Sequence, residues 1–189
     1  MSDGLNIVGS KRSDNTDREE NDFYATDPKA IKDLAKFVNI YWKVWENACW
    51  TGNLSKELIE LPSVSEVIAT DLINRWHWTW WIDFLKEDFD NVDADWIITN
   101  PPYKHWKEWI EKSLKLAPNV AMMMKLAFLE SSSRYEWFKT SWLKQVLVFS
   151  KRLWVYKNNI KTKNSWLVAY AWFVFDNKYT WKPTIDWIK

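Results

Sequence analysis

The chain has only three glycines among its 189 residues, and this scarcity restricts the turns that it can form. Average glycine usage is about 7%, which would give roughly 13 glycines in a chain of this length. Tight turns between strands and helices often need a positive φ angle, which glycine adopts at little steric cost. The same chain contains 17 tryptophans, so any turn-rich fold must be reconciled with both counts.

The remaining composition is typical of a globular protein of one domain, with 47% hydrophobic and 27% charged residues. No apolar run approaches the roughly 18 residues of a membrane span, and residues 1–22 lack the apolar core of a signal peptide. We therefore expect a cytoplasmic protein with no membrane partner. Cys49 is the only cysteine, and His77 and His105 are the only histidines, so we expect neither an internal disulfide nor a metal site.

Strand-like and helix-like segments alternate along the chain, which predicts an α/β sheet with helices on both faces. Residues 1–21 are polar and aperiodic and are expected to form a disordered tail, with a single domain over 22–189. The last two predicted strands are expected to pair antiparallel. The predicted strands are 43–49, 65–72, 94–100, 119–126, 145–152 and 167–176, and the predicted helices begin near Thr26-Asp27-Pro28 and cover 52–61 and 104–116.

The strongest local motif is Asn100-Pro101-Pro102-Tyr103, directly after an apolar strand. Ligands of open α/β sheets bind outside the carboxyl ends of the strands, which is where this motif falls. An amide oxygen of Asn100 and the carbonyl of Pro101 could accept the two hydrogens of an amino group, favouring a nucleophilic nitrogen as charge develops. Tyr103 offers a π-face for stacking a planar base. The alternative is a proline turn that only ends the strand.

A second motif, Glu46 to Gly52, lies between a predicted strand and a predicted helix. A glycine turn there would let the backbone approach a nucleotide-like ligand. Asp71 ends the next strand, 19 residues after Gly52, near the roughly 20-residue spacing of an acid that binds ribose hydroxyls. Asp83 and Phe84 follow, and could contact an adenine ring by hydrogen bonding and stacking.

The order and spacing of these motifs resemble the S-adenosylmethionine-dependent DNA adenine-N6 methyltransferases, especially the small phage-type enzymes. The resemblance covers residues 22–177. It implies a Rossmann-like class I methyltransferase fold, with a mixed, mostly parallel sheet and a late antiparallel strand. It also implies S-adenosylmethionine as cofactor, DNA as partner, and direct methyl transfer to adenine N6 with no covalent intermediate.

The resemblance further implies a role for each matching residue. The segment Asp22 to Pro28 is similar to the motif that contacts the methionine part of the cofactor, with Tyr24, Thr26 and Pro28 as candidate contacts. The other implied cofactor contacts are Glu46, Ala48, Cys49, Trp50 and Gly52 in the glycine loop, Asp71 for the ribose, and Asp83 and Phe84 for the adenine. The implied catalytic residues are Asn100, Pro101, Pro102 and Tyr103.

Two loop residues depart from the family pattern, because Asn47 stands where the family has proline and Trp50 where it has glycine. An indole at the first glycine position would fill space that the cofactor needs. Other tryptophans also stand where glycine is expected: Trp76, Trp78, Trp80 and Trp81 in one short loop, and Trp42, Trp142, Trp154, Trp166 and Trp181 at predicted turns.

We hypothesise that many of these tryptophan codons are UGA. Some bacterial lineages read UGA as glycine and others as tryptophan, so a gene of the first kind translated by the second rule would produce this composition. The alternative is a protein truly rich in tryptophan. The tryptophans in apolar surroundings are expected to be genuine: Trp45, Trp109, Trp137 and Trp172.

Charge is unevenly divided along the chain. Residues 1–103 carry 10 Lys and Arg against 19 Asp and Glu, whereas residues 104–189 carry 16 against 6. The basic half suggests a polyanionic partner, although a solvated lysine-rich surface would give the same count. Because only 47 residues separate Gly52 from Asn100, a DNA-reading segment must follow Tyr103. The candidate DNA contacts are Lys104, Lys107, Lys151, Arg152, Lys157, Lys161 and Lys163.

Two other functions remain open from the sequence. Related families with the Asn-Pro-Pro-Tyr arrangement methylate amino or amide nitrogens in RNA or on protein glutamine. A catalytically dead methyltransferase fold that binds nucleic acid is the third possibility, and Trp50 taken literally favours it. The oligomeric state is left open, with a monomer as the simplest case.

Overall fold

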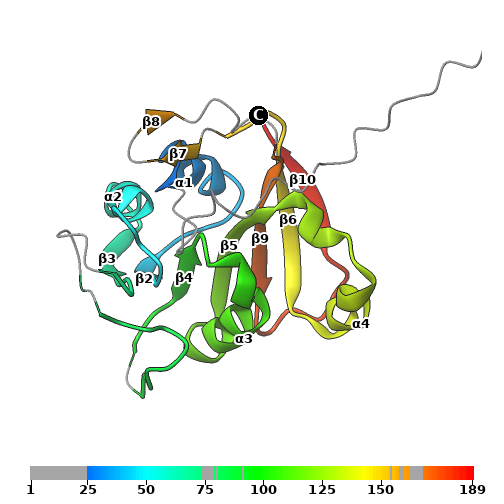
Figure 1. Ribbon diagram of the computed structural model, residues 1–189, viewed down its shortest axis with the longest axis horizontal. Coiled ribbons are helices and arrows are strands. Elements are labelled where there is room, and N and C mark those ends of the chain that lie inside the picture. Colours follow the sequence, from blue (N-terminus) through cyan, green and yellow to red (C-terminus); the bar gives the residue numbers. More distant parts are fainter. Residues whose placement is uncertain are drawn as a thin grey trace, which may run out of the picture.

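The computed structural model describes residues 25–73, 79, 81–90, 92–153, 155–157, 160–161 and 168–189, so the expected tail over 1–21 lies outside the described residues. Its largest element is a seven-stranded sheet with strand order β10-β6-β9-β5-β4-β2-β3 (Figure 1). The strands of this sheet are β2 (Trp42–Glu46), β3 (Val64–Ala69), β4 (Trp96–Thr99), β5 (Asn119–Lys125), β6 (Leu143–Phe149), β9 (Tyr170–Asp176) and β10 (Thr184–Ile188).

The sheet is mixed but mostly parallel. β2 pairs parallel with both β3 and β4, β4 pairs parallel with β5, and β10 pairs parallel with β6. β9 alone runs against its neighbours in this sheet, since it pairs antiparallel with β5 on one side and β6 on the other. The predicted α/β fold with a late antiparallel strand is therefore confirmed, as is the antiparallel pairing of the strands predicted at 145–152 and 167–176.

Helices cover both faces of the sheet (Figure 1). α1 (Lys29–Leu34) and α2 (Asn53–Ile59) contribute to one buried cluster, and α3 (Trp106–Leu116) and α4 (Ser132–Thr140) pack against the other. Strand residues alternate between the two clusters because successive side chains point to opposite faces. Along β5, for example, Met123 belongs to the α1–α2 side, whereas Met122 and Met124 belong to the α3–α4 side.

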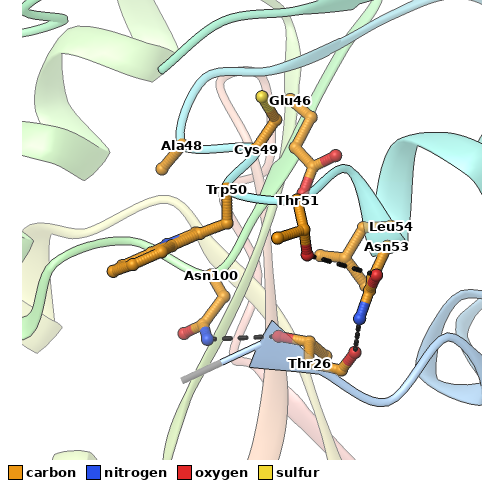
Figure 2. Close-up of a pocket in the computed structure, with 9 residues that line it drawn as sticks. All are labelled: Thr26, Glu46, Ala48, Cys49, Trp50, Thr51, Asn53, Leu54 and Asn100. Atoms are coloured by element: carbon orange, nitrogen blue, oxygen red, sulfur yellow. Dashed lines mark hydrogen bonds between the residues drawn. The ribbon is translucent and has the colours of Figure 1, made fainter. Parts of the chain in front are cut away.

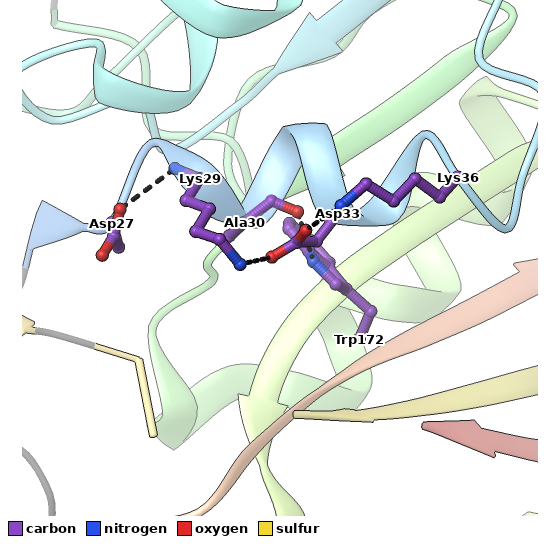
Figure 3. A network of polar contacts seen from close by, with 6 residues as sticks. All are labelled: Asp27, Lys29, Ala30, Asp33, Lys36 and Trp172. Atoms are coloured by element: carbon purple, nitrogen blue, oxygen red, sulfur yellow. Dashed lines mark hydrogen bonds and ion pairs between the residues drawn. The ribbon is translucent and has the colours of Figure 1, made fainter. Parts of the chain in front are cut away.

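Polar contacts organise α1, and one of them joins it to β9 (Figure 3). Asp27 accepts a hydrogen bond from the Lys29 backbone N–H at 3.0 Å, which agrees with the helix start predicted here. The Trp172 indole on β9 donates to the Ala30 carbonyl oxygen at 3.0 Å. Asp33 is buried, and its carboxylate lies 2.5 Å from Lys29 Nζ and 2.7 Å from Lys36 Nζ. Burial opposes its ionisation, but the two ammonium groups hold the pKa of Asp33 below its ordinary value.

A second, smaller sheet of order β1-β7-β8 joins the start of the described chain to its basic segment. It consists of β1 (Ala25–Thr26), β7 (Val155–Lys157) and β8 (Ile160–Lys161). β1 pairs antiparallel with β7, so that Thr26 lies opposite Val155. This pairing brings β7 of the basic segment beside β1, the first element of the described chain, which the sequence patterns do not predict.

Candidate functional site

A pocket lies where β2 and β4 end, beside the start of α2 (Figure 2). Its empty volume is about 210 Å³, part of which is open to solvent. This is the carboxyl edge of the parallel strands, where open α/β sheets bind their ligands. The residues that line it are Thr26, Glu46, Ala48, Cys49, Trp50, Thr51, Asn53, Leu54 and Asn100.

The Asn100 amide is held on both sides. Its Nδ2 donates to Thr26 Oγ1 at 3.1 Å, and its Oδ1 accepts from the Tyr103 hydroxyl at 3.1 Å. β4 delivers the residue to the pocket edge, and Pro101 and Pro102 end the strand because they lack the N–H groups that would extend it. Pro101 is buried, and Pro102 and Tyr103 are half-buried. A carbonyl oxygen has two lone pairs, so Asn100 Oδ1 keeps one acceptor position beyond its bond to Tyr103.

Glu46 ends β2 as a buried carboxyl group in the pocket wall, 2% exposed. Burial raises the pKa of Glu46 to about 8, and the nearby Asp71 carboxylate adds to this rise. The Ser55 hydroxyl donates to Glu46 Oε2 and works in the opposite direction, because it stabilises the carboxylate. Glu46 is therefore a protonated, hydrogen-bonding group at neutral pH rather than a charge.

The loop after β2 makes a tight turn in which the Gly52 N–H donates to the Cys49 carbonyl at 2.6 Å. Trp50, the second residue of this turn, has φ 55°, and Gly52 has φ 73°. Asp71 accepts from the Trp50 backbone N–H at 2.9 Å and from the Ile73 N–H at 2.9 Å. The predicted ribose-binding acid thus holds the loop directly but is not among the residues that line the pocket.

The Trp50 side chain lies on the same side of the pocket as Ala48 and Asn100, away from Thr51 and Asn53 (Figure 2). Among the described residues with positive φ, those other than glycine are all tryptophans: Trp42 at 54°, Trp50 at 55° and Trp81 at 66°. A left-handed conformation costs a non-glycine residue roughly 1–2 kcal/mol, and it is an outlier for a bulky side chain.

The predicted adenine contacts lie away from the pocket lining. Phe84 is 1% exposed, and its ring centroid is 5.5 Å from Trp45 and 4.8 Å from Trp109, so it is a core residue here. Asp83 forms an ion pair with Lys86 at 3.0 Å. Burial opposes its ionisation, but Lys86 and backbone N–H groups hold its pKa below the ordinary value. Pro28 caps α1 outside the lining, and Tyr24 lies outside the described residues.

The described predicted DNA contacts follow the Asn100 motif or lie in the region of β6 to β8. Lys104 and Lys107 are exposed just after the Asn100 motif, with Lys107 Nζ 3.9 Å from Glu111. Lys151 and Arg152 are exposed directly after β6, which runs in the same direction as β5 and so ends at the same edge. The backbones of Lys157 and Lys161 belong to β7 and β8, and Lys163 lies outside the described residues.

Several residues of the site carry no signal in the sequence patterns. Asn53 opens α2 and donates from Nδ2 to the Thr26 carbonyl at 3.2 Å, and Thr51 donates to Asn53 Oδ1 at 3.3 Å. Lys125, at the carboxyl end of β5, places its Nζ 5.1 Å from the Tyr103 ring centroid, within cation–π range. In the described part of the chain, no group of three or more His, Cys, Asp or Glu side chains could hold a metal ion.

No protein-family model and no curated protein sequence match the chain. Solved structures do match its architecture. A Listeria monocytogenes protein assigned to the class I S-adenosylmethionine-dependent methyltransferases is 12% identical, with a TM-score of 0.59, over 85% of this chain and 63% of that one. A Pyrococcus horikoshii protein assigned as an RNA methyltransferase is 16% identical, with a TM-score of 0.58, over 79% and 82%.

A dimethyladenosine transferase from Plasmodium falciparum is 18% identical, with a TM-score of 0.57, over 82% of this chain and 63% of that one. The chain therefore spans less than two thirds of the length of the Listeria and Plasmodium proteins. At these identities the likeness defines the fold, which is the Rossmann-like fold of class I methyltransferases. Within the described residues, no helix has the length and apolar character needed to cross a membrane.

Proposed function

We propose that this chain is an S-adenosylmethionine-dependent methyltransferase that modifies the N6 amino group of adenine in DNA. The observation that carries the proposal is the position of the Asn100 amide. It lies in the same pocket as Glu46 and the loop after β2, at the edge where this fold binds ligands. A proline turn with only a structural role would not need its preceding side chain held by two hydrogen bonds beside a pocket.

The free acceptor position of Asn100 Oδ1 suits one N–H of a substrate amino group. The Pro101 carbonyl would take the other N–H, since two consecutive prolines restrict the backbone around it. An amino group conjugated with a purine ring is a poor nucleophile because its lone pair is delocalised. Two acceptors that favour a pyramidal nitrogen would return that lone pair to the nitrogen as it reacts. Tyr103 would stack on the base, as aromatic rings do on flipped nucleotides.

The polar groups that line the pocket suit S-adenosylmethionine, but the room left inside the pocket does not. Glu46, Asn53 and Thr26 offer hydrogen-bonding groups for hydroxyl and amino groups of a nucleoside and an amino acid. The indole of Trp50 takes up the wall where a nucleoside would lie, so the chain with tryptophan at this position does not fit S-adenosylmethionine.

DNA is favoured over other substrates by two features of the chain. The segment Asp22 to Pro28 resembles the DNA methyltransferase pattern. In addition, β7, which lies within the basic segment 151–163, pairs with β1, whose Thr26 lines the pocket. RNA is the second candidate, because two of the structural neighbours are named as an RNA methyltransferase and a dimethyladenosine transferase. Their names describe those proteins, and for this chain they only motivate the comparison of substrates.

The test is methyl transfer from labelled S-adenosylmethionine to unmethylated duplex DNA, to RNA and to protein, followed by nucleoside and amino-acid analysis. It should be run on the Trp50→Gly variant beside the chain with Trp50. We expect label in N6-methyldeoxyadenosine, and loss of label in a Trp50→Gly, Asn100→Ala double variant that still binds cofactor. Label confined to RNA or protein would contradict the DNA assignment. Cofactor binding without transfer to any substrate would favour the catalytically dead alternative.

A further inference from the structure

We propose that residue 50 is glycine in the functional protein, encoded like residues 42 and 81 by a UGA codon that its source organism reads as glycine. This glycine opens the pocket to a nucleoside-sized ligand, so residue 50 determines whether the site can bind its cofactor. The identity of the ligand rests on the proposed function, whereas the assignment of glycine rests on backbone geometry and burial.

The backbone supplies the first argument. Every described residue other than glycine with a positive φ is a tryptophan, at positions 42, 50 and 81. Tryptophan is among the residues least suited to this conformation, and glycine is the residue that adopts it freely. A functional need for large side chains does not explain why tryptophan occupies all three of these positions.

Two of these positions also have the local hydrogen-bonding pattern that glycine serves. Trp50 is the second residue of the turn closed by the bond from Gly52 N–H to the Cys49 carbonyl. A positive φ at that place is the mark of the primed turns, in which glycine predominates. Trp42 stands at the register shift between the parallel strands β2 and β3, where glycine would adopt the left-handed φ without steric cost.

Burial supplies an independent argument. Trp42 is 63% exposed and Trp81 is 71% exposed, and two other tryptophans at predicted turns, Trp142 and Trp181, are 43% and 80% exposed. By contrast, Trp45 and Trp172 are 1% and 0% exposed within the core. Tryptophan is highly buried on average, so these four exposed tryptophans contrast with the two in the core. Trp50 itself is half-buried, and its assignment rests on its φ angle and its place in the turn.

The consequence for the pocket follows from the position of the indole. Replacing the Trp50 side chain with hydrogen removes the group that lies beside Ala48 and Asn100 (Figure 2). In this variant the backbone N–H of residue 50 still donates to Asp71, so the loop keeps this hydrogen bond. At residue 50 the pocket is then lined by backbone atoms instead of an indole. Such a surface allows the close approach to a nucleotide-like ligand that a glycine loop provides.

The codons of the gene test whether these tryptophans are encoded by UGA. We expect UGA at codons 42, 50 and 81, and UGG at codons 45 and 172, whose side chains are buried. UGG at codons 42, 50 and 81 would overturn the assignment. Mass spectrometry of the protein isolated from its source, with glycine found at residue 50, would support it directly, and tryptophan found there would overturn it.

Paired variants test the backbone part without any ligand. At each of residues 42, 50 and 81, the Gly variant should melt about 2–4 °C above the Ala variant, because both remove the indole and only glycine tolerates the left-handed φ. Trp187 is the matched control, since it is 65% exposed but lies in strand β10. There the order should reverse, because glycine weakens a strand relative to alanine. Equal or reversed melting at 42, 50 and 81 would overturn the assignment.

Cofactor binding then separates this inference from the proposed function. Calorimetry with S-adenosylmethionine should show binding by Trp50→Gly and at least a 100-fold weaker affinity for the chain with Trp50. Trp81→Gly is the control that leaves the pocket wall unchanged and should not restore binding. If the Gly variants are more stable but Trp50→Gly binds no cofactor, the glycine assignment stands and the proposed function fails. Equal binding by Trp50→Gly and the chain with Trp50 would overturn the role of residue 50.

Discussion

Asn100 donates a hydrogen bond from its Nδ2 to Thr26 Oγ1 at 3.1 Å, although the two residues are 74 positions apart in the sequence. Thr26 belongs to β1 of the small sheet, and Asn100 follows β4 of the large one. Thr26 also accepts from Asn53 through its carbonyl oxygen, so one buried residue connects the pocket wall, α2 and the proposed catalytic amide. The orientation of Asn100 therefore depends on a residue outside its own motif.

We expect Thr26→Val to reduce methyl transfer by about 10- to 100-fold, because small displacements of a reacting group have effects of this size. Valine keeps the shape of threonine but cannot accept the hydrogen bond from Asn100. The measurement is kcat and cofactor affinity in the Trp50→Gly background, with the loss expected in kcat. Thr26→Ser, which keeps the hydroxyl, should recover most of the rate. An equal loss in both variants would show that packing at Thr26, rather than its hydroxyl, matters.

Glu46 makes folding stability depend on pH. Its pKa is raised from an ordinary 4.5 to about 8, so between these values the folded chain keeps a proton that the unfolded chain has released. The contribution is complete below pH 4.5 and is lost as the pH rises toward 8. Urea unfolding should therefore show a free energy of unfolding that falls across this range. In Glu46→Gln the fall should be smaller, and an unchanged slope would contradict a protonated Glu46.

Asp33 has the opposite pH dependence. Lys29 and Lys36 hold its pKa below the ordinary 3.8, so its contribution is present above that pH and is lost as the pH falls further. We expect Asp33→Asn to lower the free energy of unfolding by about 1–2 kcal/mol at pH 7, since both lysines are largely exposed and partly screened. The difference should narrow below pH 4. A constant difference would indicate a packing effect unrelated to the carboxylate charge.

Trp172 should behave as a core residue. Trp172→Phe removes the indole N–H that donates to the Ala30 carbonyl and leaves a small void, so we expect a loss of about 2–3 kcal/mol in the free energy of unfolding. Trp181→Phe is the matched control, because Trp181 is 80% exposed, and it should change stability by less than about 0.5 kcal/mol. Similar effects at both positions would contradict the contrast between core and exposed tryptophans.

Lys151 and Arg152 should contribute to DNA affinity without affecting the cofactor. Replacing both with alanine should weaken binding at low salt and reduce the slope of log affinity against log salt by about 1–2. Lys178 and Lys182 provide a control of equal charge, because they are exposed near the opposite edge of the sheet, after the end of β9. Their replacement should leave the slope nearly unchanged. Equal effects of both pairs would indicate nonspecific attraction by net charge.

The sheet could be predicted mainly where strands are continuously apolar. The residues of β4 are all buried, and those of β5 and β9 nearly so, and such runs are typical of strands covered on both faces. β10 was not predicted, because its first residues are exposed and only Ile188 is buried. α4 was not predicted either, since none of its residues is buried and it has no apolar stripe.

Individual residues of the site could be predicted from the sequence, but the contacts between them could not. Asn100 follows β4 and Glu46 is the last residue of β2, and the rule for open sheets places both at one edge. The bond between Thr26 and Asn100, and the pairing of Thr26 with Val155, depend on tertiary packing between distant segments. Local periodicity carries no information about such contacts. Phe84 shows the same limit, because its burial against Trp109 depends on a helix that comes later in the chain.

The insertion of β9 between β5 and β6 has a consequence for how the protein is made. The two earlier strands leave the ribosome first, yet their final neighbour is a strand that begins at Tyr170. They cannot pair with each other in the final sheet, because β9, which is synthesised later, lies between them. Long-range pairing of this kind folds slowly. We therefore expect the sheet to close only once β9 has been synthesised, and the exposed edges of β5 and β6 to make chaperone binding important until then.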